Sequence, residues 1–575
     1  MKRFEFVPLC ACLLLFLGLT SSRVHDFDLF WQLQSGKYLW QSGTFIYHDL
    51  FSLAAEAPRW EHCWLHDLIV YGVYNLAGYA GISLWKGLLL TITAGLLAVV
   101  ARRRGASWTI ILSCAPILWL MTRLGWAERP QLWSYLFFAL FLLILEEYRQ
   151  RPTRLVWLLV PLAILWANLH AGSILAFPLV LAYVAGVGFD IVRQRPPTLT
   201  GRDWRRLLLV FTALIPASLL TPYGLSTLRA LLTSSSLGVD SGELMQLYNM
   251  DWAPTTYVAM PWFFYALAVV VAVCLLNGRR AAASDLFLLG GLAFMGFKLV
   301  RHTPFFFFAV AALLPLLIDN VYRQWVGPRS SVTRGIIVAT ALALLLYPYA
   351  RLALPELKAS GWFDRGLRVW HFPVAAADFV RSEKLPGNLW NTYDWGGYLM
   401  WTLYPDYRVF WDGRQDSKEM FTAGLAVMRG DPGWEALLDR YQVRTVVTKA
   451  CTVDTGEHYP LLDRLQGNPD WALVFADVSA LIFVRRTDVP AEWLQQQELP
   501  AARIDDTILS EAGLLVKAGP GRYMAWWEMA RFHLARNDYR RAFPLLERHL
   551  QTAPPGRQVA EAENYYRILY PLMQR

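Results

Sequence analysis

Charge is scarce in this 575-residue chain. Asp, Glu, Lys and Arg together make up 17% of it, whereas 55% is hydrophobic. The mean hydropathy is +0.30, which is higher than that of ordinary soluble domains. The hydrophobic residues form repeated runs of nearly the length that a helix needs to cross a bilayer. The composition therefore indicates a polytopic membrane protein.

Cysteine is equally scarce, with six residues in the whole chain. Four lie within apolar runs, and the remaining two, Cys63 and Cys451, are far apart. This distribution indicates neither a disulfide framework nor a zinc site. A G-x-G-x-x-G or phosphate-loop pattern is also missing, so a tight turn at a helix start explains Gly396 and Gly397 better than a nucleotide site does.

The net charge of +9 suggests a nucleic-acid binder only superficially. Most Arg and Lys residues lie in short clusters between apolar runs, as cytoplasmic loops of membrane proteins do. These clusters are at 102–104, 149–154, 193–206, 279–280 and 323–334. We therefore expect no nucleic-acid partner.

The apolar runs predict about eleven transmembrane helices. Residues 1–20 resemble a signal peptide, but cleavage would detach them from a loop that begins at once, so we expect an uncleaved first helix. Further spans are expected at about 82–101, 108–122, 131–146, 155–169, 172–190, 206–220, 257–276, 285–300, 303–319 and 333–351.

The stretch from Trp64 to Gly78 is also apolar enough to cross. Counting it as a crossing would place Arg102 to Arg104 on the outer side and invert every later loop, against the positive-inside rule. We therefore expect it to lie along the membrane interface or to dip into it. The odd number of spans then places the part beyond about residue 352 outside the cytoplasm.

Three domains are predicted. Residues 1–352 form the membrane domain with a large first outer loop at 21–81, residues 353–490 an α/β domain, and residues 491–575 a helical tail. Strands are expected at 388–393, 408–412 and 444–448, with a hairpin over 471–486 that turns near Asp477 and Ser479.

The tail has the pattern of one tetratricopeptide helical pair, carried by Trp527, Ala530, Leu534, Tyr539 and Ala542. A single repeat cannot bury its own face. The tail is therefore expected to cap the α/β domain or to bind a protein partner.

Polar and ionisable residues gather on the outer side of this topology. A charge at hydrocarbon depth costs about 2.5 to 3.5 kcal/mol, so such a gathering indicates a function. The residues are His25, Asp26, Asp28, Arg59, Glu61, His62, His66, Asp67, Arg123, Glu128, Arg129, Asn168, His170, Tyr223, Glu243, Asp251, Lys298, Arg301 and His302.

These residue types suit transfer from a lipid-linked phosphate. A carboxylate above the membrane accepts a proton from an attacking hydroxyl, and cationic side chains neutralise the phosphate that leaves. Trp and Tyr either stack on sugar faces or form the interfacial belt, and the belt accounts for most of the 26 Trp.

Simpler explanations stand beside this one. Asp26 and Asp28 would be a solvated pair at the membrane edge, and Asp412 with Arg414 a structural ion pair, which we favour for that pair. Arginines 123 and 129 would only snorkel to the headgroups, and residues 168 and 170 would pack helices together. The i, i+4 spacing of residues 62 and 66 fits a pair of metal ligands, although interfacial histidines are commoner.

Eight segments resemble those of a known family. They are Asp26–Gly36, His48–Ser52, Arg129–Gln131, Trp166–Gly172, Thr221–Gly224, Arg301–Phe305, Asn391–Tyr398 and Phe410–Arg414. In this order and on a common side they resemble bacterial membrane glycosyltransferases of the GT-C superfamily. The resemblance covers most of the chain to about residue 486.

The resemblance implies a transferase that uses a polyprenyl-phosphate sugar at the outer face of the bacterial inner membrane, usually with inversion. It places the catalytic base in the first loop, and we expect Asp26 to be the base and Asp28 to orient the acceptor or the base. Donor-phosphate contacts are expected from Arg123, Arg129, Lys298, Arg301 and His302. Sugar or acceptor contacts are expected from Trp31, Glu61, His62, Asp67, Asn168, His170 and Tyr223. A divalent metal is the one cofactor left open, with His62 and His66 as its candidate ligands.

Two departures keep another class of protein open. Gln32 stands where the family often has histidine, and Cys63 where an acid before Trp64 is expected. A non-catalytic scaffold that recruits an envelope complex would tolerate both. A transporter would gather its ionisable groups near the midplane on broken helices, often in two repeated halves, whereas this chain has edge clusters and no internal repeat.

Overall fold

The chain folds into two compact units in the computed structural model. The first comprises residues 1–26, 35–45 and 60–367, and the second comprises residues 27–34, 46–59 and 368–575. The structure describes residues 3–54, 59, 61–192, 199–226, 253–278, 281–325, isolated positions between 332 and 347, 365–368, 371–414, 417–518 and 521–573.

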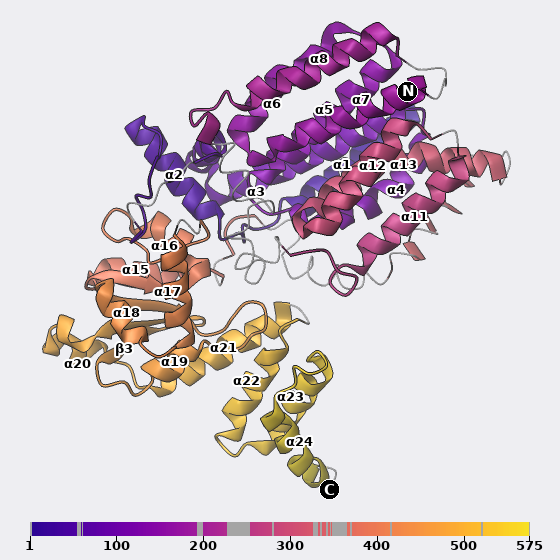
Figure 1. Cartoon of the computed structure of the whole chain (residues 1–575). Coiled ribbons are helices and arrows are strands. Elements are labelled where there is room, and N and C mark those ends of the chain that lie inside the picture. The colour runs from indigo at the N-terminus through magenta and orange to yellow at the C-terminus, as the bar shows by residue number, and fades with distance from the viewer. Residues whose placement is uncertain are drawn as a thin grey trace. The chain divides into compact units, whose positions relative to one another are not determined.

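Long helices that run side by side make up the first unit (Figure 1). They are α1 (Arg3–Thr20), α3 (Trp64–Arg103), α4 (Trp108–Met121), α5 (Gln131–Gln150), α6 (Leu159–Leu169), α7 (Ala176–Val192), α8 (Gly201–Ser218), α11 (Pro261–Asn277), α12 (Ala283–Lys298) and α13 (Thr303–Trp325). A helix lies in every expected span as far as residue 319, and the last expected span, 333–351, is described only in part.

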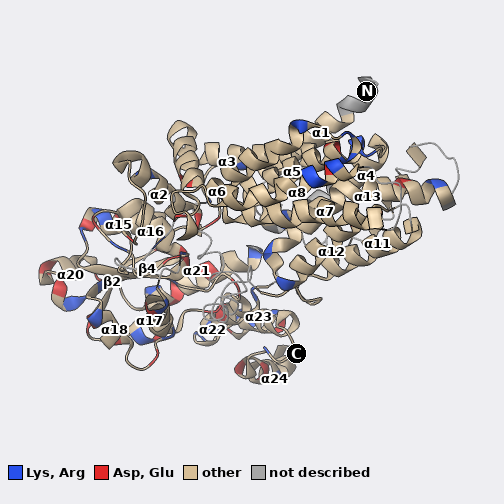
Figure 2. Cartoon of the chain, turned by 45° about the horizontal axis from the view of Figure 1, so that its top comes forward, with Lys and Arg blue, Asp and Glu red and all other residues tan. Residues whose placement is uncertain are grey.

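Within the described residues, four helical stretches are long and apolar enough to cross a membrane. They are 64–103, 131–150, 171–192 and 300–324. Shorter apolar helices lie at 8–20, 154–169 and 261–277. The helices of the first unit carry few charged residues, which gather near helix ends, whereas charged residues of both signs are spread along the second unit (Figure 2).

Helix α3 is broken at Ala77 and Gly78, where the backbone leaves the helical region. Gly78 has φ +57°, a conformation that glycine adopts without strain. The stretch from Trp64 that we expected at the interface is therefore a separate helical arm. Leu76, at the end of this arm, is 89% exposed.

Helix α2 (Leu29–Ser42) packs closely on the start of α3. A Cβ atom on Gly36 would lie 2.1 Å from the backbone oxygen of Asp67. Only glycine allows this approach, so Gly36 fixes how the second half of α2 meets α3.

The second unit contains a four-stranded sheet of order β1-β2-β4-β3. Strands β1 (Asn388–Asn391) and β2 (Val443–Lys449) are parallel, whereas β4 (Ala480–Arg485) is antiparallel to β2 and β3 (Trp471–Ala476). The sheet's helices are α15 (Val374–Glu383), α16 (Gly396–Leu403), α17 (Lys418–Arg429), α18 (Trp434–Arg440) and α19 (Pro460–Leu465).

The hairpin expected over 471–486 is confirmed, and its turn is held by the Asp477 carboxylate, which accepts from the amides of Ser479 and Ala480. The strand expected at 408–412 is wrong. Val409 forms only an isolated bridge with Ser52, and the Phe410 amide donates to the side chain of Asn391. The backbone is thus paired with the first loop and a side chain instead of a neighbouring strand.

Five helices follow the sheet: α20 (Ala491–Gln497), α21 (Ala502–Ala518), α22 (Tyr523–Leu534), α23 (Tyr539–Thr552) and α24 (Ala560–Met573). Helix α22 packs on α21 and α23, and α23 packs on α24. Trp527, Ala530, Leu534 and Ala542 are buried in one core, as their spacing predicted. Tyr539 is 39% exposed instead.

Candidate active site

The carboxylate of Asp26 is buried at the end of the segment that follows α1. Its Oδ2 accepts a hydrogen bond from Nε of Arg129 over 2.6 Å, and the side chain of Asp26 is only 4% exposed. The backbone amide of Asp26 donates to Oε2 of Glu128 over 3.2 Å. Two consecutive residues before α5 thus fix both the backbone and the side chain of Asp26.

Glu128 is in turn held by a buried lysine. The ammonium of Lys86, in α3, bonds to Oε1 of Glu128 and donates to Oγ of Ser22 over 3.1 Å, and both charged side chains are fully buried. Burial opposes ionisation of Glu128, but Lys86 and then His25 outweigh it and hold its pKa below the ordinary value. Glu128 therefore remains a carboxylate that accepts from the first loop.

Sequence reasoning named Glu128 but missed Lys86. The signal was present, since Lys86 is an ionisable residue inside an otherwise apolar expected span at 82–101. Such residues are functional candidates by default because their burial is costly. Lys86 was missed because it lies within a span and not in one of the polar clusters at the span ends.

A second group of polar contacts begins one turn along α5. Nε1 of Trp133 donates to Nδ1 of His66 over 3.1 Å, and Oγ of Ser134 lies 2.6 Å from Nδ1 of His170. The amide of Gly172 also donates to Nδ1 of His170. Because Nδ1 accepts in both histidines, each carries its proton on Nε2 when neutral.

Glycine is required at position 172. A Cβ atom there would lie 2.3 Å from Oγ of Ser134 and 2.6 Å from Nδ1 of His170. The close approach orients His170. Asn168 also accepts from Nε1 of Trp64 over 2.9 Å.

One guanidinium and two imidazoles lie near His170. Arg301, His62 and His66 all lie within electrostatic range of it. Arg301 comes from the 3-10 turn Val300–His302, ahead of α13, so distant segments contribute to one basic cluster. The first turn of α5, which carries Ser134, adds the partial positive charge of a helix N-terminus.

An aromatic series leads away from this cluster. The ring of Trp64 lies edge-on to Phe45 at 5.3 Å, and Phe45 lies edge-on to Tyr223 at 6.1 Å. Tyr223 is itself buried. Aromatic faces and edges of this kind suit contact with a sugar or an isoprenoid chain.

Other expected site residues lie at varying distances along the first unit. Arg123 lies in the turn Arg123–Gly125, in the same connection as Glu128. Glu61 is buried and accepts from Ser35, and Asp67 is buried at the start of α3. His302 follows Arg301. Lys298 is exposed with its ammonium over the ring of Phe294, and Glu243 and Asp251 lie outside the described residues.

Asp28 and Trp31 belong to the second unit, unlike Asp26. Oδ1 of Asp28 would lie 2.3 Å from a Cβ atom on Gly413, so the side chain faces the Phe410–Arg414 segment. The guanidinium of Arg59 lies over the ring of Trp31 at 5.3 Å. Asp26 and Asp28, although two positions apart in the first loop, therefore contact different parts of the chain.

A buried ion cluster ties the first loop to that same segment. Arg414 donates to both oxygens of Asp412 over 2.7 Å and to Oδ1 of Asp49 over 2.9 Å, and all three side chains are at most 3% exposed. The structural ion pair expected between Asp412 and Arg414 is confirmed. The sequence did not reveal that Asp49 completes it.

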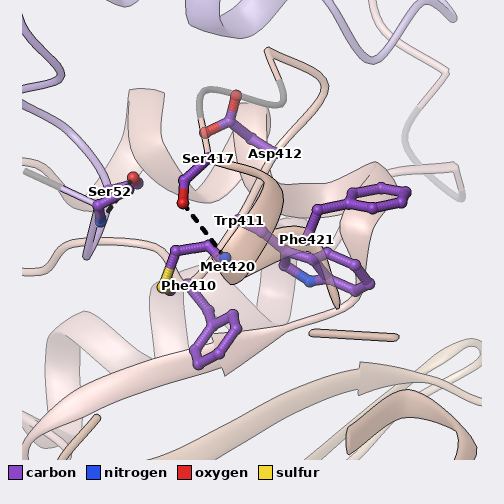
Figure 3. Close-up of a pocket in the computed structure, with 8 residues that line it drawn as sticks. Ser52, Phe410, Trp411, Asp412, Ser417, Met420 and Phe421 are labelled. Atoms are coloured by element: carbon purple, nitrogen blue, oxygen red, sulfur yellow. Dashed lines mark hydrogen bonds between the residues drawn. The ribbon is translucent and has the colours of Figure 1, made fainter. Parts of the chain in front are cut away.

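Figure 3 shows a pocket beside this cluster, lined by Ser52, Phe410, Trp411, Asp412, Ser417, Met420 and Phe421. Its cavity volume is about 20 Å³, which suits one water molecule and not a sugar. The transfer site is therefore not placed here. In the described ranges no group of three or more His, Cys, Asp and Glu is arranged to hold a metal ion.

No family model and no curated protein matches the sequence. Solved structures do match. Arabinofuranosyltransferase AftD from Mycobacteria aligns with a TM-score of 0.53 and 14% identity over 84% of this chain and 40% of that one. A mutant of AftD aligns with a TM-score of 0.51 and 16% identity, over 84% of this chain and 41% of that one. ArnT from Cupriavidus metallidurans was solved bound to undecaprenyl phosphate. It aligns with a TM-score of 0.46 and 13% identity, over 85% of this chain and 100% of that one.

This chain spans about two fifths of the length of AftD. At such identity the alignment establishes a common fold. The resemblance to glycosyltransferases of the GT-C superfamily, which the sequence motifs first indicated, is confirmed at the level of the fold.

Proposed function

We propose that the chain is a membrane glycosyltransferase that moves a sugar from a polyprenyl-phosphate donor to an acceptor hydroxyl outside the cytoplasm. The acceptor is a glycan, a lipid or a protein. The proposal includes about eleven spans in the bacterial inner membrane, with the second unit on the outer side. The observation that carries it is the Asp26–Arg129 contact at the start of α5, beside the basic cluster around His170.

The reaction needs a base and a charge sink within a short distance. Asp26 takes the proton of the acceptor hydroxyl as the oxygen attacks the anomeric carbon. The bond between that carbon and the phosphate oxygen breaks, and the polyprenyl phosphate leaves with its electron pair. Arg129 and Arg301 neutralise the leaving phosphate.

Separate groups of residues at the start of α5 support these two roles. Glu128 and Arg129 hold the base, and Trp133 and Ser134 orient His66 and His170. The proposal keeps Asp28 as the residue that orients the acceptor or the base. Arg123, Lys298 and His302 complete the donor-phosphate contacts, while the aromatic series ending at Tyr223 borders the donor.

Transfer from a panel of radiolabelled polyprenyl-phosphate sugars tests the proposal, with purified protein in membrane lipids and envelope extract as acceptor. Asp26→Asn should lower transfer by about 100- to 10,000-fold, the usual contribution of a general base. The matched control is Asp378→Asn, because Asp378 is 68% exposed on α15 and should not matter.

Transfer by the wild type that is lost in a folded Asp26→Asn protein would support the enzyme and identify its donor. Wild-type transfer that survives Asp26→Asn would remove Asp26 as the base. Failure of every donor, with Asp26→Asn still complementing a deletion strain, would leave a scaffold as the better explanation.

A further inference from the structure

A buried group of charges closes the carboxyl end of β2, and the transfer chemistry does not use it. Lys449 ends β2 and is 2% exposed. Its ammonium lies 4.0 Å from Oε1 of Glu511, in tail helix α21. Oε2 of Glu511 also accepts from the backbone amides of Ala450 and Cys451, over 3.0 and 2.7 Å. Helix α21 is thus docked on the sheet through this carboxylate.

The ammonium of Lys449 also faces aromatic rings. It lies 5.5 Å from the ring centre of Phe27 and 5.5 Å from that of Trp395. Phe27 stacks on His371 at 4.4 Å and meets Phe372 edge-on at 5.5 Å. Phe27 begins the segment 27–34, the part of the first loop that belongs to the second unit and carries Asp28.

One lysine therefore contacts both the tail and the first loop. We propose that Lys449 is a positioning residue that clamps segment 27–34 onto the α/β domain, and that docking of α21 through Glu511 sets the strength of this clamp. The proposal concerns placement of the segment and does not depend on the transfer reaction.

Desolvation supplies the physical link between the two contacts. Attraction between an ammonium and an aromatic face is stronger when the ammonium is out of water. Helix α21 covers Lys449, so detachment of α21 would hydrate the ammonium and weaken its hold on Phe27. Trp395 and the backbone of β2 would remain in place.

The protonation of Glu511 gives the clamp a pH dependence. Burial raises the pKa of Glu511 from 4.5 to about 7, although Lys449 and the two amides oppose the rise. The docked state therefore binds this proton more tightly than a detached state, and docking weakens as pH rises from about 4.5 to about 7. Charged and titratable neighbours on the surrounding elements are Asp394, Cys451, Asp454, Tyr459, Asp477, Glu528 and Arg531.

Hydrogen exchange of the full chain in lipid nanodiscs tests the clamp. Peptides from 27–34 are followed at about pH 6 and pH 8, with labelling times scaled for intrinsic exchange. Wild-type exchange of this segment should be at least about threefold faster at the higher pH, in line with the loss of one desolvated cation–π contact. Glu511→Gln should abolish the difference.

Lys449→Met should accelerate exchange of 27–34 by about threefold at the lower pH, while β2 stays protected. Matched controls are Lys418→Met and Glu492→Gln, both at exposed positions of the same unit. Unchanged exchange of 27–34 in Lys449→Met with β2 protected, or no pH dependence in the wild type, would overturn the proposal. If Lys449→Met also accelerates exchange of β2, the isosteric Glu511→Gln variant decides the matter. A pH dependence of 27–34 exchange that persists in that variant would overturn the proposal.

Discussion

The Nε–H of Arg129 donates to Oδ2 of Asp26 although the two residues are 103 positions apart in the chain. Arg129 is 30% exposed, whereas the carboxylate of Asp26 is 4% exposed. The arginine can therefore meet a ligand from the open side while it holds the acid on the other. This geometry suits a residue that neutralises a leaving phosphate beside the base.

Arg129→Gln should lower transfer by about 100- to 1,000-fold, which is the usual effect of removing one donor that stabilises developing negative charge. Arg129→Lys should lie between wild type and Arg129→Gln, because lysine keeps the charge but loses the planar fork. Initial rates with the donor identified in the panel measure both. Arg205→Gln is the control, since Arg205 lies at an exposed position of α8. A rate within threefold of wild type in Arg129→Gln would contradict the assignment.

Lys86→Met should destabilise the first unit by about 3 to 5 kcal/mol, because it leaves the carboxylate of Glu128 buried without its partner. Glu128→Gln alone should have a similar effect through the stranded ammonium. The double variant should recover most of the loss, since Gln still accepts from the amide of Asp26 and no buried charge remains. Thermal unfolding in detergent micelles measures the four proteins as a double-mutant cycle.

Additive losses in that cycle would show that the two residues act independently, and the ion pair would then not be what holds the first loop. Arg103→Met with Glu147→Gln is the matched control cycle, because that pair is 50% and 31% exposed. Its coupling should be below about 1 kcal/mol, as for other surface pairs.

Local patterns in the sequence were enough to predict some of the fold. Apolar runs located helices up to residue 319, and alternation located the β3–β4 hairpin, because both depend on residues near each other in the chain. The expectation of a strand at 408–412 failed because its backbone forms only an isolated bridge with Ser52 and a bond to the side chain of Asn391, and no neighbouring strand in the described part of the chain pairs with it. Periodicity carries no information about such distant contacts.

The site was predictable in its residue types but not in its pairing. Asp26 and Arg129 both stood out, yet nothing local indicated that they touch, or that Asp28 belongs to a different unit. Asp49 was missed because Asp412 already offered Arg414 a partner two residues away. Lys86 was missed although its isolated charge was visible, so a search for single buried ions would have found it.

Ser52→Ala should make the second unit less resistant to acid. Burial opposes ionisation of Asp49, but Arg414 and then Ser52 outweigh it and lower the pKa below 3.8. The stability from this carboxylate is therefore present above its ordinary pKa and lost as pH falls through the lower folded value. Removing the hydroxyl should cost about 1 kcal/mol near neutrality and shift acid-induced exchange of residues 409–414 to higher pH. Ser510→Ala, on exposed α21 surface, should leave the titration unchanged.

His458 should stabilise docking of α22 at low pH and lose that contribution as pH rises. Its Nδ1 lies 2.9 Å from Glu528 and its Nε2 3.0 Å from Asp463. Burial disfavours the charged imidazole, but these carboxylates outweigh burial and raise the pKa above 6.5. The stabilisation is thus complete below about pH 6.5 and disappears as pH rises through the higher folded value.

His458→Gln should therefore lower the local stability of α22 by about 1.5 to 3 kcal/mol near pH 5.5, the usual size of hydrogen bonds to charged groups. Near pH 9 it should make little difference, because the wild-type imidazole is then neutral as well. Hydrogen exchange of α22 peptides measures the local free energy at both pH values. His533→Gln is the matched control, since His533 faces one carboxylate, Asp538, at 3.5 Å. An equal loss at both pH values would mean that His458 acts through packing and not through its charge.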